Sequence, residues 1–375
     1  MNSEFGMSRA NAETIEFKRA PLWFEYSVVL HVHSRYSDGS GSVLDILEDA
    51  QASHIDVLLL TDHDTRKGAE DPGEGYYGRT LLLVGGEITP PQNHLLAFFT
   101  RELPSAQESW AEIVNQVSRH GGLSFVAHPN DLGNRILRLP SYRWTEREIR
   151  GFTGLEIWNH LSHWSNGVKG VISAFRSLLN PWKGLEHPRA EDLALWDQLA
   201  QEALTQDNKG VVGIGGTDAH AVVIGRGWFA FKVFPYRVSF GTIRTQVYLT
   251  EPLNRDVTHD RGLIKDALGQ GRCAVMAYHY GSERGFRLWA ESGKHSWPMG
   301  SQVPLEPNLR LKAISPVPVS WGVFHNGTQV STATGYLLDT LVEYPGVYRV
   351  ELYRGKRQRG WLYPNPVYVV ANRTD

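Results

Sequence analysis

The sequence contains a single cysteine, Cys273, among 375 residues. One thiol excludes an internal disulfide framework and the cysteine-rich zinc modules, and it fits a reducing compartment. Apolar residues never run for the roughly 18 positions that a membrane span needs, and the N-terminus lacks a basic-then-apolar signal pattern. The formal charge is only -2, so no global field attracts a long polyanion such as nucleic acid. We therefore expect a cytoplasmic protein without a membrane partner, and leave the oligomeric state open.

The length and composition indicate a packed chain of one large and one small domain. Hydrophobic residues make up 41% of the chain, which is enough for a sizeable core. We predict an N-terminal extension at 1–20, whose opening MNSEFG is typical of a cloning remnant. A large domain at 21–280 and a small domain at 281–375 follow.

The large domain alternates strand and helix patterns. The predicted strands are 23–31, 55–60, 80–84, 94–100, 123–127, 154–158 and 211–215, and the predicted helices are 43–54, 105–119, 168–179 and 190–205. The first helix has a capping-box-like start, with Ser42 three residues before Asp45. Strands separated by helices indicate an α/β fold with a parallel sheet, and about 250 residues is the size of a TIM-type barrel.

The pattern changes in the last part of the chain. From Leu309 onward, short alternating segments are separated by turn signals such as HNG and YPG. This spacing predicts a small antiparallel β-sandwich.

Six of the fifteen histidines, together with three carboxylates, lie at the predicted strand ends or in the loops beside them. They belong to HVHSRYSD (31–38), TDH (61–63), GGE (85–87), NH (93–94), AHP (127–129) and TDAH (217–220). In parallel α/β folds such ends converge at one rim. His31 and His33 are two residues apart, so on extended chain they face the same side. Imidazole and carboxylate hold Zn, Mn and Fe, and the pattern therefore predicts a multinuclear metal site.

Each fragment alone also has a structural interpretation. An HxH pair arises by chance about 0.6 times in such a chain. The aspartates of TDH and TDAH could cap turns, and Glu87 could be a capping carboxylate. His94 could be an ordinary core histidine, and His128 a turn residue before Pro129. Their joint occurrence at strand ends and the following loops favours the metal site.

The ordered series HVHSRYSDGS, TDHD, GGEIT, NHLLAFF, VAHP, GLEIWNH and GGTDAH resembles the polymerase and histidinol phosphatase (PHP) superfamily of metal-dependent phosphoesterases. The resemblance covers roughly residues 24–280. It implies a distorted (β/α)7 barrel of about seven strands and a centre of three divalent ions. The ligands it implies are His31, His33, Glu87 and Asp218 for the first ion, Glu87, His94 and His128 for the second, and Asp38, His63 and His220 for the third. The short stretch between Glu87 and His94 leaves the depth of the pocket, and hence the substrate size, open.

The predicted activity is hydrolysis of small phosphomonoesters or phosphodiesters. Bound cations lower the pKa of water towards about 7, so a hydroxide that bridges two ions, held by Glu87, would attack phosphorus. Asp62 and Asp64 flank His63 and would either orient its ring or cap backbone. Arg35 would either contact a phosphate oxygen or remain solvated. Glu156 ends another strand and is expected to support the rim.

Two other functions and one other mechanism stay open. One is an exonuclease or oligonucleotide phosphodiesterase, although nucleic acid is not the favoured partner. Another is a non-catalytic PHP module whose metals only hold the fold. A serine or cysteine triad is the less favoured mechanism, because Cys273 and the scattered serines have no convincing histidine partner in the sequence.

Overall fold

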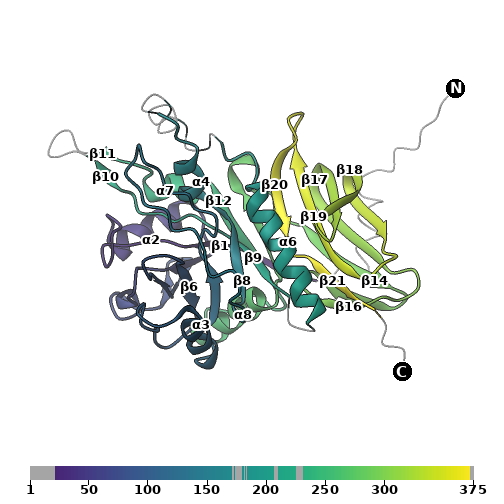
Figure 1. Cartoon of the computed structure of the whole chain (residues 1–375), viewed down its shortest axis with the longest axis horizontal. Helices are drawn as coiled ribbons and strands as arrows, with labels where there is room; N and C mark the ends of the chain where they lie inside the picture. Colours follow the sequence, from purple (N-terminus) through teal and green to yellow (C-terminus); the bar gives the residue numbers. More distant parts are fainter. Residues whose placement is uncertain are drawn as a thin grey trace.

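The computed structural model describes residues 22–371, apart from 171–172, 174–179, 181, 183, 207–209 and 225–230. The expected extension at 1–20 and most of the predicted helix 168–179 lie outside the described residues. In Figure 1 the N-terminal α/β part and the C-terminal strands lie side by side, with helix α6 (Ala190–Thr205) between them. Helix α6 matches the predicted 190–205 and packs against strands of both parts.

The first sheet begins with parallel strands, as the β-α-β pattern predicts. Strands β1 (Phe24–Leu30), β2 (Val57–Leu60) and β4 (Thr80–Val84) are parallel, and β3 (Gly75–Tyr77) pairs antiparallel at the edge. Helix α2 (Val43–Ala52) joins β1 to β2 and starts at the predicted capping box of Ser42 and Asp45.

The second sheet mixes parallel and antiparallel pairs. Its strands are β5 (Gly86–Ile88), β6 (Leu95–Phe98), β7 (Leu123–Val126), β8 (Gly154–Asn159) and β9 (Val212–Gly216). β7, β8 and β9 are parallel, but β6 is antiparallel to both neighbours. The connection from β5 to β6 is shorter than the dozen residues of a parallel crossover, so it can only form a hairpin. Helix α3 (Trp110–Arg119) starts later than predicted because Ser109 caps it.

The two sheets approach each other beyond their strand ends. Isolated bridges pair Val32 with Ala219 and His63 with Glu87. Among the described residues no continuous ladder of strand pairs closes the two sheets into one barrel. The fold is therefore a mixed α/β fold, as predicted, whereas the seven-stranded barrel is not confirmed.

The first sheet also continues into the C-terminal part. Next to β1 come β12 (Ile243–Leu249) and β13 (Cys273–Ala277), and β13 pairs with β20. The C-terminal strands are β14 (Arg287–Ser292), β15 (His295–Pro298), β16 (Gln302–Pro304), β17 (Arg310–His325), β18 (Thr328–Leu341), β19 (Gly346–Arg354), β20 (Arg359–Pro364) and β21 (Val367–Val370). They are antiparallel except for β16 with β21. A separate sandwich is not confirmed because these strands belong to the same sheet as β1, and the boundary at 280 stays a prediction.

The remaining elements are short apart from one helix. They are α4 (His160–Asn166), α7 (Tyr236–Phe240), α8 (Val257–Gly269), β10 (Val223–Ile224) and β11 (Phe231–Lys232), with 3-10 turns at Lys67–Ala69 and Tyr278–Tyr280.

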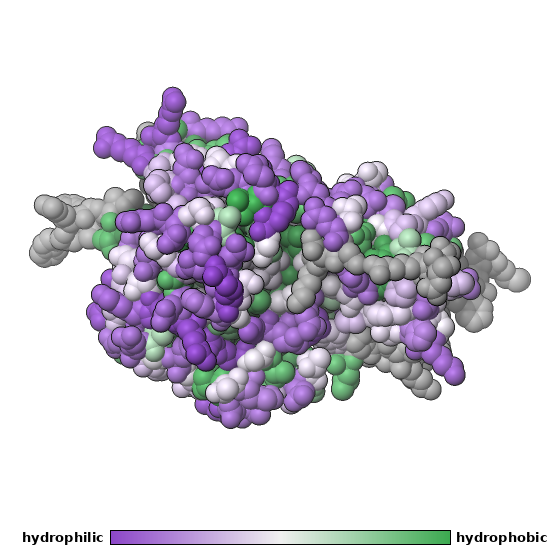
Figure 2. Space-filling view, turned by 60° about the horizontal axis from the view of Figure 1, so that its bottom comes forward, coloured by the Kyte–Doolittle hydropathy of each residue, from purple (hydrophilic) through white to green (hydrophobic). Residues whose placement is uncertain are grey.

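A shared apolar core holds the two N-terminal sheets together. Leu30 and Leu59 of the first sheet pack in one buried cluster with Leu96 and Ile214 of the second. Burying such a side chain stabilises the fold by about 1.5–3 kcal/mol, so the cluster fixes the strand ends above it. The face in Figure 2 is mainly hydrophilic, with smaller hydrophobic patches. In the described part of the chain, none of the helices has the length and hydrophobicity of a membrane span.

Candidate metal centre

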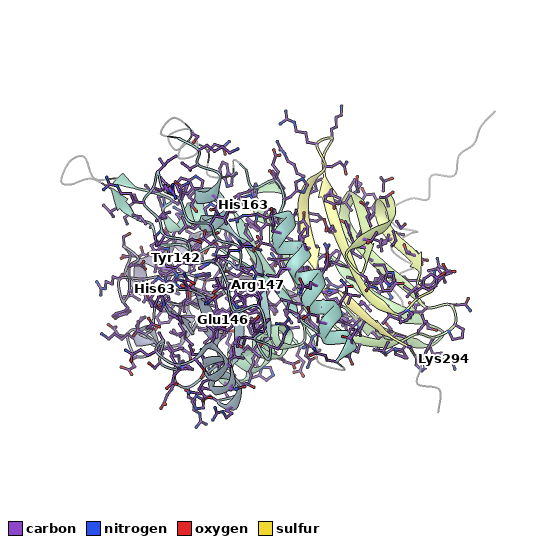
Figure 3. The ribbon with its side chains drawn as sticks, viewed as in Figure 1. His63, Tyr142, Glu146, Arg147, His163 and Lys294 are labelled. Atoms are coloured by element: carbon purple, nitrogen blue, oxygen red, sulfur yellow. The ribbon has the colours of Figure 1, made fainter. Side chains whose placement is uncertain are left out.

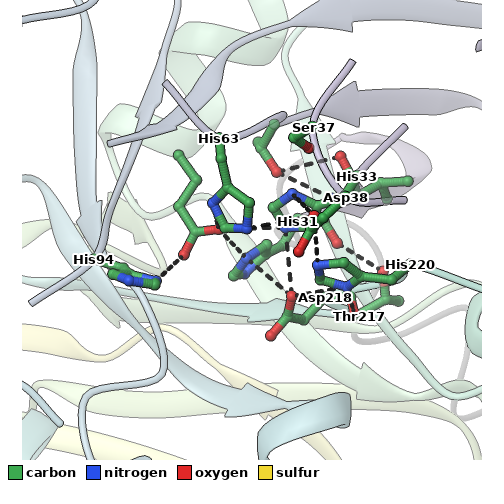
Figure 4. Close-up of polar contacts among 12 residues, drawn as sticks. His31, His33, Ser37, Asp38, His63, His94, Thr217, Asp218 and His220 are labelled. Carbon is green, nitrogen blue, oxygen red and sulfur yellow. Dashed lines mark hydrogen bonds and ion pairs between the residues drawn. The ribbon is translucent and has the colours of Figure 1, made fainter. Parts of the chain in front are cut away.

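All nine predicted ligands lie at one rim of the two sheets. Figure 4 shows this cluster and labels its members except Glu87 and His128. His31 and His33 follow β1, His63 follows β2, and His128 follows β7. Asp218 and His220 follow β9, and Asp38 lies in the loop after β1. Glu87 sits within β5, and His94 precedes β6 rather than following a strand. Because β6 runs antiparallel to β7, its start reaches the same rim.

Glu87 lies at the centre of the cluster. Its Oε2 is 3.1 Å from His31 Nε2 and 3.3 Å from both His33 Nε2 and His63 Nδ1. Its Oε1 is 2.9 Å from His94 Nδ1 and 3.3 Å from His128 Nε2. The side chain is only 1% exposed. One buried carboxylate is therefore shared by five imidazoles, the arrangement expected of a bridging ligand.

Asp218 shares ring nitrogens with Glu87, whereas Asp38 contacts the ring nitrogen of His63 that Glu87 does not. Asp218 Oδ1 is 3.4 Å from both His31 Nε2 and His33 Nε2. Asp38 Oδ1 is 3.1 Å from His220 Nε2 and 3.5 Å from His63 Nε2.

Three overlapping groups bring ligand atoms within 4.8 Å of one another. They are the Asp38 group (His33, Asp38, His63, His220), the Asp218 group (His31, His33, Asp218) and the Glu87 group (His31, Glu87, His128). The Asp218 group is the implied first set without Glu87, and the Asp38 group is the implied third set with His33 added. His94 stands outside the three groups and contacts Glu87 instead.

The backbone is left-handed at three of these residues. The φ angles are 61° at His31, 27° at His128 and 52° at Asp218. Residues other than glycine rarely adopt this region, and where they do the surrounding structure holds them there, most often at functional sites. The strand ends are therefore bent so that side chains from different strands meet.

Glu156 fixes the orientation of His31. Its Oε1 lies 2.8 Å from His31 Nδ1, and its Oε2 accepts hydrogen bonds from His128 N and Asn159 Nδ2, both at 2.9 Å. With Nδ1–H donated to Glu156, the Nε2 lone pair of His31 points at the centre. Gly216 makes this approach possible, because a Cβ there would lie 1.8 Å from Glu156 Oε1. The prediction that Glu156 supports the rim agrees with these contacts.

Asp62 and Asp64 have partners other than His63. Asp62 accepts hydrogen bonds from Ser34 N, Ser34 Oγ and Ser37 Oγ, each at 2.7 Å. Asp64 accepts from Thr89 N at 2.9 Å and from Thr89 Oγ1. These contacts correct the orienting role and favour the structural alternative, since both carboxylates tie loops of the rim together.

Arg35 and Tyr236 also differ from what the sequence predicts. Arg35 is exposed and does not line the pocket, so its predicted phosphate contact has no support. Tyr236, which sequence reasoning missed, donates to His33 O at 2.8 Å and accepts from Gly41 N at 3.1 Å. It thereby holds the loop after β1 in place.

In the metal-free centre, neighbouring carboxylates raise the pKa of His128 and His220, whereas burial lowers the pKa of His94. Burial alone would lower the pKa of His220, but its hydrogen bond with Asp38 and the charges of Asp218 and Asp38 raise the pKa to about 9. Burial opposes the shift of His128 as well, yet its hydrogen bond with Glu87 and that negative charge raise the pKa to about 9. Bound cations would take the place of these protons.

The buried ring nitrogens fit divalent ions. His33 is fully buried, and neither its Nδ1 nor its Nε2 has a hydrogen-bond partner. The Nδ1 atoms of His63 and His128 are also buried without a partner. Such atoms destabilise a fold unless something satisfies them. Because His33 Nε2 faces both Glu87 and Asp218, an ion between them would meet one nitrogen and two carboxylate oxygens, a donor set that suits Zn, Mn and Fe.

The solved structures that are similar to this chain share little sequence with it. A two-domain protein of Bacteroides vulgatus, described as containing a predicted PHP-like metal-dependent phosphoesterase, is 14% identical with a TM-score of 0.44, and the match covers 92% of this chain and 95% of that one. A protein of Bifidobacterium adolescentis, described as a candidate metal-dependent phosphoesterase, is 18% identical with a TM-score of 0.32, over 55% of this chain and 90% of that one. The chain is similar to PHP-like metal-dependent phosphoesterases.

An uncharacterized protein of Methanocaldococcus jannaschii is 27% identical in an alignment of 128 residues that covers 29% of this chain and 74% of that protein. No family model matches the chain. At these identities the function has to be argued from the ligand geometry.

A pocket of about 540 Å³ opens over the centre. It is lined by Asp38, His63, Glu87, Thr89, Pro90, Pro91, His94, His128, Asp131, Leu139, Pro140, Tyr142, Leu161, Ser162, Ser165, Asp218, His220 and Val222. Tyr142, another residue that sequence reasoning missed, packs its ring on His94 with centroids 4.2 Å apart, and it lies beside His63 in Figure 3. The pocket has room for a small molecule next to the ligands.

Proposed function

We propose that this chain is a metal-dependent phosphoesterase of the PHP type that hydrolyses small phosphate monoesters or diesters. The observation that carries the proposal is the position of Glu87, whose two oxygens are shared by five imidazoles in the middle of three overlapping ligand groups. A single structural ion needs about four ligands, not nine. The excess of donors supports a catalytic, multinuclear centre.

The number of ions, their ligands and the barrel are also proposed, and they follow from the resemblance to the PHP superfamily. Three divalent ions, Zn, Mn or Fe, would be held by the nine residues, with Glu87 shared between two of them. The two N-terminal sheets would correspond to one distorted barrel, since bridges join them at the rim. Location in the cytoplasm, and a small phosphorylated substrate in place of nucleic acid, remain predictions.

When bound, the ions would supply a water of low pKa and neutralise phosphoryl oxygens. The chain's own residues position that chemistry. Glu156 orients the His31 ring, and Asp62 fixes the loop that carries Asp38. Five imidazoles surround the Glu87 carboxylate and leave the side chain only 1% exposed, which keeps bulk water away from it.

Side-chain nucleophiles have little support among the described residues. Burial raises the pKa of the Cys273 thiol to about 12, and the residue is fully buried outside the pocket. Ser162 Oγ already donates to Asp131 Oδ1 at 2.9 Å, and Ser165 Oγ donates to Ser162 O at 3.0 Å. An attacking group held by metal ions therefore accounts for the site better than a triad does.

The test combines metal content with turnover. The purified protein is analysed for bound transition metals, stripped with a chelator, reloaded with Mn or Zn, and assayed with p-nitrophenyl phosphate and its bis-ester. We expect turnover that depends on metal and nearly disappears in His33→Ala. His295→Ala is the matched control, because His295 is exposed in β15. The proposal fails if the protein holds no transition metal and gains no activity from Mn or Zn.

A further inference from the structure

Beside the metal ligands, the pocket is lined largely by apolar side chains and, among the described residues, by no cationic one. Pro90, Pro91, Leu139, Pro140, Leu161 and Val222 line it. No lysine or arginine of the described chain lines the pocket. Nucleotides and sugar phosphates carry further anionic or hydroxyl groups, which lose their hydrogen bonds when they are placed against such a wall.

The polar groups of the pocket offer these substrates little. Apart from that of Tyr142, the hydroxyl groups of the pocket have partners in the protein, since those of Ser162 and Ser165 donate to protein oxygens and Thr89 Oγ1 donates to Asp64. Asp131 accepts from Ser162 and Asn166. Their hydrogen-bonding capacity is largely used within the protein.

Two of the apolar side chains are unusually open to solvent. Leu139 is 41% exposed and Val222 is 45% exposed, and both lie at the pocket rather than on a remote surface. The ring of Tyr142 completes this side of the pocket beside His94. Exposed apolar area next to a metal centre gains free energy when an apolar group of the substrate covers it.

We infer that the pocket takes a phosphate ester whose alcohol part is uncharged and apolar, best an aromatic ring lying against Tyr142, Leu139 and Val222. This inference rests on the proposed phosphoesterase function and adds the class of substrate. The phosphoryl group would lie over the ligand cluster, and the apolar group would replace water at the wall.

The experiment compares benzyl phosphate with glycerol phosphate on the metal-loaded full chain. Both are esters of primary alcohols, so their intrinsic reactivities are similar. We expect kcat/KM for benzyl phosphate to be roughly tenfold to hundredfold higher, because the ring buries apolar area that glycerol cannot. Turnover of both esters at equal rates, or a preference for glycerol phosphate, overturns the inference and leaves the proposed function standing. If the metal-loaded protein hydrolyses none of benzyl phosphate, glycerol phosphate and p-nitrophenyl phosphate, the result counts against the proposed function itself.

A double variant tests whether the wall causes the preference. Leu139→Ser with Val222→Ser removes two exposed apolar side chains, so the fold should persist, which circular dichroism checks. The ratio of the two kcat/KM values should fall about tenfold towards glycerol phosphate. Leu44→Ser is the matched control, because Leu44 is 56% exposed on α2 and outside the pocket. An unchanged ratio in the double variant overturns the inference.

Discussion

Replacing Gly216 with alanine should disturb the metal centre by displacing Glu156, which orients the metal ligand His31. Gly216 is buried at the end of β9, and the Cβ of an alanine would lie 1.8 Å from Glu156 Oε1 and 2.9 Å from His31 Cβ. Its φ is outside the left-handed region, so the backbone itself accepts alanine. The whole effect should therefore come from displacing Glu156 and the His31 ring.

The size of the effect follows from the contacts that would be lost. Forcing one methyl group into a packed site costs roughly 1–3 kcal/mol. The displaced carboxylate also loses hydrogen bonds to His31 Nδ1 at 2.8 Å and His128 N at 2.9 Å. A hydrogen bond to a charged group contributes about 1.5–3 kcal/mol. With partial relaxation, the free energy of unfolding of the metal-free protein should fall by about 2–4 kcal/mol, and metal affinity should fall about 10–100-fold.

Urea unfolding in chelator measures the first quantity, and titration calorimetry with Mn measures the second. Gly262→Ala is the control, since Gly262 is exposed in α8 and a Cβ there meets nothing within 4 Å. That variant should be neutral or more stable by up to about 1 kcal/mol, because alanine favours helix. If the urea midpoint of unfolding and the affinity for Mn are the same in Gly216→Ala as in the wild-type protein, the steric reasoning is wrong.

Three further outcomes are expected. First, the pKa values of His128 and His220 are raised from 6.5 to about 9 in the metal-free fold. The contribution of these protonated histidines to the free energy of unfolding is complete below pH 6.5 and is lost as the pH rises through 9, which urea unfolding at several pH values would show. Metal affinity should rise over the same pH range, because metal ions and protons compete for the rings, and calorimetry at several pH values would show this rise. Second, a metal present at about a hundred times its Kd should add about 2.7 kcal/mol of stability. Chelation should therefore lower the Tm in a thermal scan, and an unchanged Tm would contradict metal binding. Third, Asp62→Ala removes the acceptor of three hydrogen bonds from Ser34 and Ser37, and should weaken Mn binding while leaving secondary structure intact in circular dichroism.

The ligands could be predicted because local patterns reveal them. His31, His33 and His63 follow apolar runs that became β1 and β2, and the convergence of strand ends is a general property of such folds. The capping box at Ser42 is equally local.

Contacts between distant segments could not be predicted in the same way. Asp62 is next to His63, yet its side chain turns to Ser34 and Ser37, since successive residues of extended chain point to opposite sides. Tyr142 lies in an irregular loop, whose position depends on long-range hydrogen bonds of the Asp131 carboxylate to Ser162 and Asn166.

The pairing of the strands was the main part of the fold that could not be predicted from the sequence. The pairing of β13 with β20, which merges the C-terminal strands into the first sheet, joins segments far apart in the chain, and alternation within each strand does not reveal its partner. The antiparallel position of β6 had the same cause, because the apolar run of a buried strand has no direction.

The left-handed backbone at His31, His128 and Asp218 has an evolutionary consequence. Each of these positions disfavours a side chain by about 1 kcal/mol relative to glycine. A descendant that no longer needed the cations could gain stability by acquiring glycine at all three. Continued selection for metal binding is what would keep histidine and aspartate there, so glycines at these sites would mark relatives that have lost the chemistry.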